Sequence, residues 1–283
     1  MKRYHLKKNV VIMIRISIIL LFFIIILKNN YLRTNLNKTG SKYVKRNFIL
    51  SKIYDNENIN NEKNVSNSDD VFKIKETVNS DYLVYLYNTH QTESYSRDVN
   101  ILYDPTIMRA TLYLKEQLGN YGINAHFEDR SISDVLTKNK WNYASSYKAS
   151  RYFLEDTIIN YPTIKYFFDI HRDSGSYNST TLCVDDACYA KILFVIGLEN
   201  ANHDQNYKMA LKLNDKLNNR LSGLSRGIIG KEGKGVNGVY NQDFSQNLLL
   251  IEIGGENNHI SEVFRSIDIL TEVLSEYIKE DNI

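Results

Sequence analysis

The chain has 283 residues, of which 43% are hydrophobic and 24% are charged, enough for one ordinary hydrophobic core with residues to spare. Its formal net charge is only +2, and Lys and Arg are scattered among Asp and Glu. No basic face stands out in the sequence, which argues against a nucleic-acid partner.

An apolar run at residues 10–27, interrupted only by Arg15 and Ser17, follows a basic N-terminal flank. About 20 apolar residues span a bilayer core, so this run is just long enough. Basic residues ahead of the run favour a cytoplasmic N-terminus, and no small-residue cleavage site follows it. We therefore predict that residues 1–28 form a cytoplasmic flank and an uncleaved transmembrane signal anchor, with a cleaved signal peptide as the alternative.

Residues 29–79 are rich in Asn, Lys, Ser, Asp and Glu, and their few apolar residues show no steady period. Such a segment cannot bury enough apolar surface to offset the entropy lost when it becomes ordered. We predict a flexible linker over residues 29–79, which leaves residues 80–283 as the globular domain.

The globular part alternates apolar, strand-like runs with stretches of helical period. Strands are predicted at residues 82–87, 123–127, 166–170, 190–197 and 248–251, and helices at about 107–118, 145–159, 206–221 and 260–277. A hairpin is predicted to turn at Asp185 and Asp186, and the Gly-rich residues 222–243 are predicted to form a mobile surface loop. This alternation predicts an α/β three-layer sandwich with a mostly parallel central sheet, preceded by one N-terminal transmembrane helix.

Three of the predicted strands end in side chains that carry chemistry. The first leads to His90 and Glu93, the third to His171 and the last to Glu252. Open α/β sheets bind ligands beyond the carboxyl ends of their strands, so these side chains are expected to meet. A lone His is more often structural than a ligand, and a loop Glu is usually solvated. Glu252 gives the strongest signal, because an acid within an apolar run is costly to bury.

Two His and one carboxylate, with an open position for water, form a common catalytic zinc arrangement. We predict that His90, Glu93 and His171 bind Zn²⁺ and that Glu252 acts as the general base. Arg172 is predicted to hold a substrate carboxylate or to stabilise a tetrahedral oxyanion.

Two further pairs of residues leave alternatives open. Asp169 and Asp173 flank His171, and either could orient its imidazole through the second ring nitrogen. Cys183 and Cys188 flank the predicted hairpin turn, where neighbouring strands lie within disulfide range. A disulfide is permitted outside the cytoplasm, and a pair of free thiols is the alternative.

The chain resembles the stage II sporulation protein P family at these residues. The matching segments are YNTHQTESY at 87–95, FDIHRDS at 168–174, FVIG at 194–197, YNQD at 240–243 and LIEIGG at 250–255. The resemblance covers most of the chain from Tyr82 onward, in the expected order, and the predicted N-terminal anchor fits the family as well.

The resemblance implies a zinc-dependent N-acetylmuramoyl-L-alanine amidase that cuts stem peptides from the glycan strands of peptidoglycan, with possible endopeptidase activity on crosslinks. It implies action during engulfment in sporulation, with the protein anchored in the mother-cell membrane and its catalytic domain, residues 80–283, in the intermembrane space. It also implies a partner of the stage II sporulation protein D type, which cleaves the denuded glycan.

By position, His90 and His171 match the two zinc-binding His of the family, and Glu252 matches its late catalytic Glu. In the wider amidase class the ligand Glu begins the first helix, but residues 100–104 contain no Glu, so we assign this role to Glu93, with Asp104 as the alternative. Two other functions compete with amidase activity: an inactive wall-binding module that recruits another hydrolase, and a zinc carboxypeptidase.

Overall fold

The computed structural model describes residues 81–98 and 104–281, all of which belong to the unit Lys75–Ile283. No helix within these residues is long and apolar enough to cross a membrane. The predicted anchor at residues 1–28 and the predicted linker at residues 29–79 lie outside the described residues.

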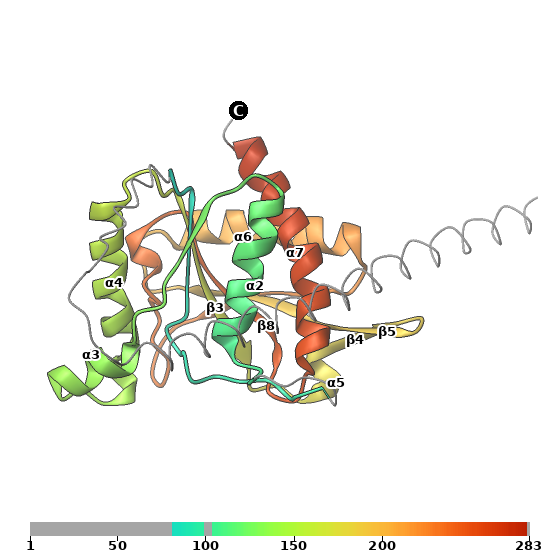
Figure 1. The fold of residues 1–283 in the computed structure, drawn as a ribbon, viewed down its shortest axis with the longest axis horizontal. Coiled ribbons are helices and arrows are strands. Elements are labelled where there is room, and N and C mark those ends of the chain that lie inside the picture. The colour runs from blue at the N-terminus through green and yellow to red at the C-terminus, as the bar shows by residue number, and fades with distance from the viewer. Residues whose placement is uncertain (1–80, 99–103, 282–283) are drawn as a thin grey trace, which may run out of the picture. The chain divides into compact units, whose positions relative to one another are not determined.

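A six-stranded sheet forms the centre of the described domain, in the order β2-β1-β3-β8-β6-β7 (Figure 1). Its strands are β1 (Val84–Tyr87), β2 (Ala125–Phe127), β3 (Tyr166–Asp173), β6 (Ile192–Gly197), β7 (Ser225–Lys231) and β8 (Leu248–Gly255). The first four strands of this order are parallel, whereas β6 runs antiparallel to β8 and parallel to β7. The predicted, mostly parallel sheet is therefore confirmed.

Helices cover both faces of this sheet. They are α2 (Ile107–Asn120), α3 (Ile132–Asn139), α4 (Ser146–Asn160), α5 (Tyr177–Thr180), α6 (His203–Arg220) and α7 (Ile260–Asp281), with 3-10 helices η1 (Tyr143–Ser145) and η2 (Gln242–Phe244). Leu154 of α4 packs against Tyr85 and Phe167 on one face. On the other face, Thr111 of α2 accepts a hydrogen bond from the Asn88 side chain. Figure 1 shows α3 and α4 to the left of the sheet and α2 beside α7.

The first helix of the domain follows the sequence signals closely. Thr106 caps α2, because its hydroxyl accepts a hydrogen bond from the backbone N–H of Arg109 at 3.3 Å. Ile107, Leu114 and Leu118 recur at helical spacing and are all fully buried. The predicted helix is confirmed, and it carries the chain back to β2 beside β1.

Two segments differ from the sequence-based prediction. Part of the predicted loop at residues 222–243 is the edge strand β7, in which Gly227 and Gly230 interrupt the apolar pattern around Ile228 and Ile229. An edge strand tolerates such glycines because it has only one neighbour to pair with. Helix α3 was not predicted, although its Ser131 cap, which accepts a hydrogen bond from Asp134, is a start signal.

The predicted hairpin is present as β4 (Thr181–Val184) and β5 (Ala187–Ala190). Its turn contains Asp185 in the left-handed conformation, with φ 52°. Cys183 and Cys188 are paired in the register of the two strands and are joined by a disulfide. Figure 1 shows this hairpin extending away from the central sheet.

Candidate active site

The carboxyl ends of β1, β3 and β8 bring four of the predicted site residues together. The sheet register places His171 of β3 directly beside Glu252 of β8. The ring centroids of His90 and His171 are 5.2 Å apart, with the rings nearly perpendicular at 80°. Oε2 of Glu93 lies 3.7 Å from Nδ1 of His171. The prediction that these strand ends meet is confirmed.

A turn after β1 explains how His90 and Glu93 reach the same place. The backbone N–H of Glu93 donates to the carbonyl of His90 at 3.1 Å, and the N–H of Ile107 donates to the carbonyl of Glu93 at 2.9 Å. The backbone N–H of Arg172 also donates to Oε2 of Glu93 at 3.1 Å. Glu93 is thus held through its backbone carbonyl by the start of α2 and through its carboxylate by the end of β3.

Asp169 positions both the loop after β1 and the imidazole of His171. This fully buried carboxylate accepts hydrogen bonds from the Thr89 backbone at 2.9 Å and from its hydroxyl at 2.7 Å. Its Oδ1 lies 2.9 Å from Nε2 of His171, at ion-pair distance but without hydrogen-bond alignment. Of the two acids predicted to orient His171, Asp169 is the one in contact, whereas Asp173 pairs with Arg226 of β7.

Opposite charges dominate the ionisation of this cluster. Burial lowers the pKa of His171, but Asp169 and Glu93 outweigh it and hold that pKa well above its usual value. Burial raises the pKa of Glu93, yet His171 and the amide of Arg172 bring it below its usual value. Burial and the charge of His171 both lower the pKa of His90. The carboxylates of Asp169 and Glu93 therefore favour a positive charge between them, and either an imidazolium or a metal ion can supply this charge.

Glu252 has the properties of a general base. Burial raises its pKa to about 7; the charge of His171 opposes the rise, and the carboxylates of Glu93, Asp173 and Asp169 add to it. Its Oε2 is buried and has no hydrogen-bond partner. A carboxyl group whose pKa lies near neutrality can both accept and return a proton at physiological pH.

The imidazole and carboxylate groups of His90, Glu93 and His171 are donors of the kinds that bind zinc. In the described part of the chain, no group of three or more His, Cys, Asp or Glu side chains is disposed to hold a metal ion as it stands. Two imidazoles and one carboxylate are nevertheless the usual donors of catalytic zinc. Nδ1 of His90 is buried without a hydrogen-bond partner, as suits an atom reserved for a ligand bond. His90, Glu93 and His171 are the residues that would hold the ion.

Two other predicted residues have different surroundings. The guanidinium of Arg172 lies 3.8 Å from Glu256 and 3.4 Å from the carbonyl of Asp173. Arg172 lies within the register irregularity of β3 between His171 and Asp173. Asp104, the alternative metal ligand, is exposed and pairs with Arg97 at 2.5 Å.

Sequence reasoning missed a row of aromatic rings that borders the site. The aromatic row consists of Tyr143, His90, Tyr147 and Tyr240, with successive ring centroids 4.9, 5.5 and 5.3 Å apart. Tyr147 also stacks on His171 at 6.4 Å. Tyr143 and Tyr147 resemble ordinary aromatic residues of a helix start, whereas Tyr240 begins the matched segment YNQD, a signal that could have been followed.

The fold and the site define a class: an α/β protein whose His and Glu side chains converge at the carboxyl edge of a mostly parallel sheet. A model of the family "Stage II sporulation protein P (SpoIIP)" matches residues 26–275. The chain belongs to this family, as the resemblance of its motifs predicted.

Comparison with known proteins finds similarity both in sequence and among solved structures. Stage II sporulation protein P of Bacillus subtilis is 35% identical over 225 residues, which cover 76% of this chain and 56% of that protein. The chain thus spans little more than half the length of this relative.

Among solved structures, the CwlD amidase from Clostridioides difficile in complex with the GerS lipoprotein has a TM-score of 0.44 at 10% identity, and the match covers 70% of this chain and 97% of CwlD. An N-acetylmuramoyl-L-alanine amidase from Clostridium difficile 630 has a TM-score of 0.40 at 11% identity, over 71% of this chain and 97% of the amidase.

Proposed function

We propose that this chain is a zinc-dependent cell-wall hydrolase of sporulation that cleaves the amide bond between N-acetylmuramic acid and L-alanine in peptidoglycan. The observation that carries the proposal is the convergence of His90, Glu93 and His171 with Glu252, whose Oε2 is buried. Membership of the stage II sporulation protein P family supports the sporulation context and the peptidoglycan substrate.

The residues of the site have separate roles in hydrolysis. Glu252 accepts a proton from the attacking water and delivers it to the nitrogen that leaves as the C–N bond breaks, and a pKa of about 7 suits both steps. His90, Glu93 and His171 would hold a zinc ion, which when bound would supply the acidification of water and the polarisation of the scissile carbonyl. Asp169 keeps the His171 imidazole in place through its 2.9 Å contact.

The cellular setting is a further part of the proposal. Residues 1–28 anchor the chain in the mother-cell membrane with the N-terminus in the cytoplasm, so that the catalytic domain faces the intermembrane space. A glycan-cleaving partner of the stage II sporulation protein D type acts on the denuded strands. A second activity on peptide crosslinks uses the same site. The sequence of the N-terminal segment and the family resemblance support this setting.

Digestion of purified peptidoglycan with the full-length chain tests the function. New N-terminal L-alanine is the expected product. Released terminal D-alanine would instead indicate a carboxypeptidase, and binding to the wall without any product would indicate a binding module. Metal analysis of the same preparation is expected to find about one zinc per chain. His90→Ala and His171→Ala should lose that zinc, whereas His259→Ala, an exposed His, should keep it.

A further inference from the structure

Tyr240 and Asn241 form a segment of unusual backbone conformation beside the candidate site. Both residues are left-handed, with φ 54° at Tyr240 and 57° at Asn241. Asn tolerates this region, but a bulky aromatic residue rarely adopts it, because its Cβ crowds the backbone. Strained residues of this kind persist where the surrounding structure enforces them, and they concentrate at functional sites.

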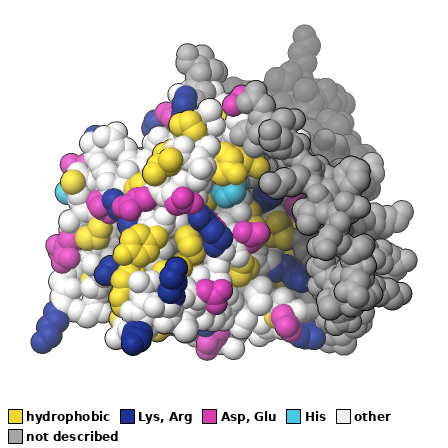
Figure 2. Space-filling view, turned by 60° about the vertical axis from the view of Figure 1, so that its left-hand side comes forward, with side chains coloured by type: hydrophobic (Ala, Val, Ile, Leu, Met, Phe, Trp, Pro, Cys, Tyr) yellow, Lys and Arg dark blue, Asp and Glu magenta, His cyan; other side chains and the backbone are white. Residues whose placement is uncertain are grey.

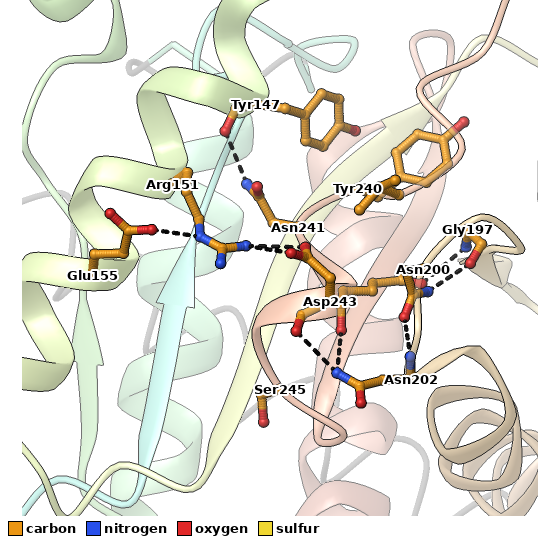
Figure 3. A network of polar contacts seen from close by, with 12 residues as sticks. Tyr147, Arg151, Glu155, Gly197, Asn200, Asn202, Tyr240, Asn241, Asp243 and Ser245 are labelled. Carbon is orange, nitrogen blue, oxygen red and sulfur yellow. Dashed lines mark hydrogen bonds and ion pairs between the residues drawn. The ribbon is translucent and has the colours of Figure 1, made fainter.

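Side chains on either side of Tyr240 hold this conformation in place. Oδ1 of Asn237 accepts a hydrogen bond from the backbone N–H of Tyr240 at 2.6 Å. The side-chain amide of Asn241 donates to the carbonyl of Tyr147 and to the hydroxyl of Ser150, both at 3.0 Å. Figure 3 shows Asn241 reaching α4 in this way, with the rings of Tyr147 and Tyr240 side by side.

Gln242, the residue after Asn241, joins the segment to the sheet through hydrogen bonds. Gln242 is fully buried; its amide donates to the carbonyl of Val195 at 2.7 Å, and its oxygen accepts from the N–H of Gly197 at 2.9 Å. Gly197 permits a close approach, since a Cβ at this position would collide with the carbonyl of Gly238. Asp243 adds a paired contact with Arg151 of α4 at 3.0 Å (Figure 3).

These contacts place the ring of Tyr240 in the aromatic row. It lies 5.3 Å from the ring of Tyr147, at 77°, and Tyr147 in turn contacts both His90 and His171. Burial raises the pKa of Tyr240, while the backbone amides of Asn237 and Gly238 oppose the rise. The ring of Tyr240 is half-exposed and is the surface that this residue offers beside the site.

We propose that Tyr240 is a substrate-contacting residue whose ring packs against the amino-sugar ring next to the scissile amide. The proposal rests on the function proposed above. The face of a half-exposed aromatic ring presents a mainly apolar surface, which matches the C–H face of a pyranose better than it matches a charged peptide. The strained backbone is retained because it places this ring beside Tyr147.

Substrate binding without turnover tests the proposal. In the full-length chain with Glu252→Gln as the parent, the affinity for an N-acetylglucosaminyl-N-acetylmuramoyl peptide is measured by calorimetry. Adding Tyr240→Asn is expected to weaken binding about tenfold, with an unchanged or higher Tm, because Asn accommodates the left-handed backbone. Tyr240→Phe keeps the ring and should bind within about twofold of the parent.

The control is Tyr121→Asn, which removes an exposed tyrosine from the far end of α2 and should leave binding unchanged. Equal binding by the parent and Tyr240→Asn would overturn the proposal and leave the proposed function standing. Weaker binding accompanied by a lower Tm would mark Tyr240 as structural and would overturn it as well. A parent that binds no wall fragment would overturn both the proposed function and the role of Tyr240.

Discussion

Glu252 occupies a location that is unfavourable for a charged carboxylate. Its strand neighbours Ile251 and Ile253 are fully buried, and its own Oε2 has no hydrogen-bond partner. Burying a carboxyl group in this way favours the neutral form, and this is the largest cause of its pKa of about 7. A structural acid would be expected to have partners for both oxygens.

Replacing Glu252 with Gln should abolish proton transfer while preserving the shape of the site. We expect Glu252→Gln to slow wall hydrolysis about 100- to 10,000-fold, the usual contribution of a general base, with unchanged zinc content. The rate of L-alanine N-terminus formation and metal analysis give the two readouts. Glu232→Gln, on the exposed surface, serves as the control. A variant with more than roughly a tenth of the wild-type rate would rule out the general-base role.

Asp169 and Asp173 provide a matched pair for testing how His171 is positioned. Asp169 contacts His171, whereas Asp173 pairs with Arg226. Losing a carboxylate that orients a metal-binding His typically weakens metal affinity about 10- to 100-fold. We therefore expect this loss for Asp169→Asn and little change for Asp173→Asn, as measured by competition with a zinc chelator. Equal effects of the two substitutions would contradict the assignment.

At the scale of secondary-structure elements, an ion pair between the buried Glu128 and the partly exposed Arg130 links α4 to the sheet. Glu128, which follows β2, accepts hydrogen bonds from Tyr85 of β1 at 2.6 Å and from Arg130 at 2.7 Å. Arg130 also contacts Asp156 of α4 at 2.5 Å. Burial raises the pKa of Glu128, but the hydrogen bonds from Arg130 and Tyr85 outweigh burial and lower it below its usual 4.5.

This ion pair predicts a pH-dependent part of the stability. Because the pKa of Glu128 is lower in the folded state, its contribution is complete above pH 4.5 and is lost as the pH falls through the folded-state value. Glu128→Gln should cost about 2–3 kcal/mol at pH 7, the loss of charged hydrogen bonds. The difference in Tm from the wild type should narrow in acid. Asp129→Asn, at the exposed neighbouring residue, is the control, and a pH-independent difference would contradict the prediction.

At the scale of the whole molecule, few surface charges contribute strongly to the free energy of folding. Figure 2 shows Lys and Arg interspersed with Asp and Glu and with apolar side chains on one face. Pairs such as Lys216 with Glu276 and Arg220 with Glu272 join α6 to α7. Exposed pairs of this kind contribute about 0–1 kcal/mol each. A ligand that binds the folded state can therefore change the overall stability more than any of these pairs.

Zinc binding should stabilise the whole domain by mass action. At a zinc concentration about 100 times its Kd, the gain is about 2.7 kcal/mol, which corresponds to a Tm increase of roughly 5–10 °C for a domain of this size. Calorimetry of the full-length chain with and without chelator measures the effect. His90→Ala should show no response, and an equal response in that variant would place the stabilising ion elsewhere.

The elements of this fold follow from local patterns. Apolar runs such as Leu248–Gly255 form strands, and the helical spacing of Ile107, Leu114 and Leu118 forms α2. The same patterns place His90, His171 and Glu252 toward the carboxyl ends of β1, β3 and β8, where open α/β sheets form their sites. β3 and β8 are longer than predicted and continue past His171 and Glu252 to Asp173 and Gly255. The sequence by itself thus determined the fold class, the family and the residues that meet at the carboxyl edge of the sheet.

Only the tertiary structure decided which neighbours these residues have. A register shift between His171 and Asp173 turns Asp173 toward Arg226 and leaves Asp169 beside the imidazole. The aromatic row joins Tyr147 and Tyr240, which lie on separate segments. The physical reason is that sequence patterns report which face of an element is apolar, whereas contacts between distant segments depend on strand register and packing.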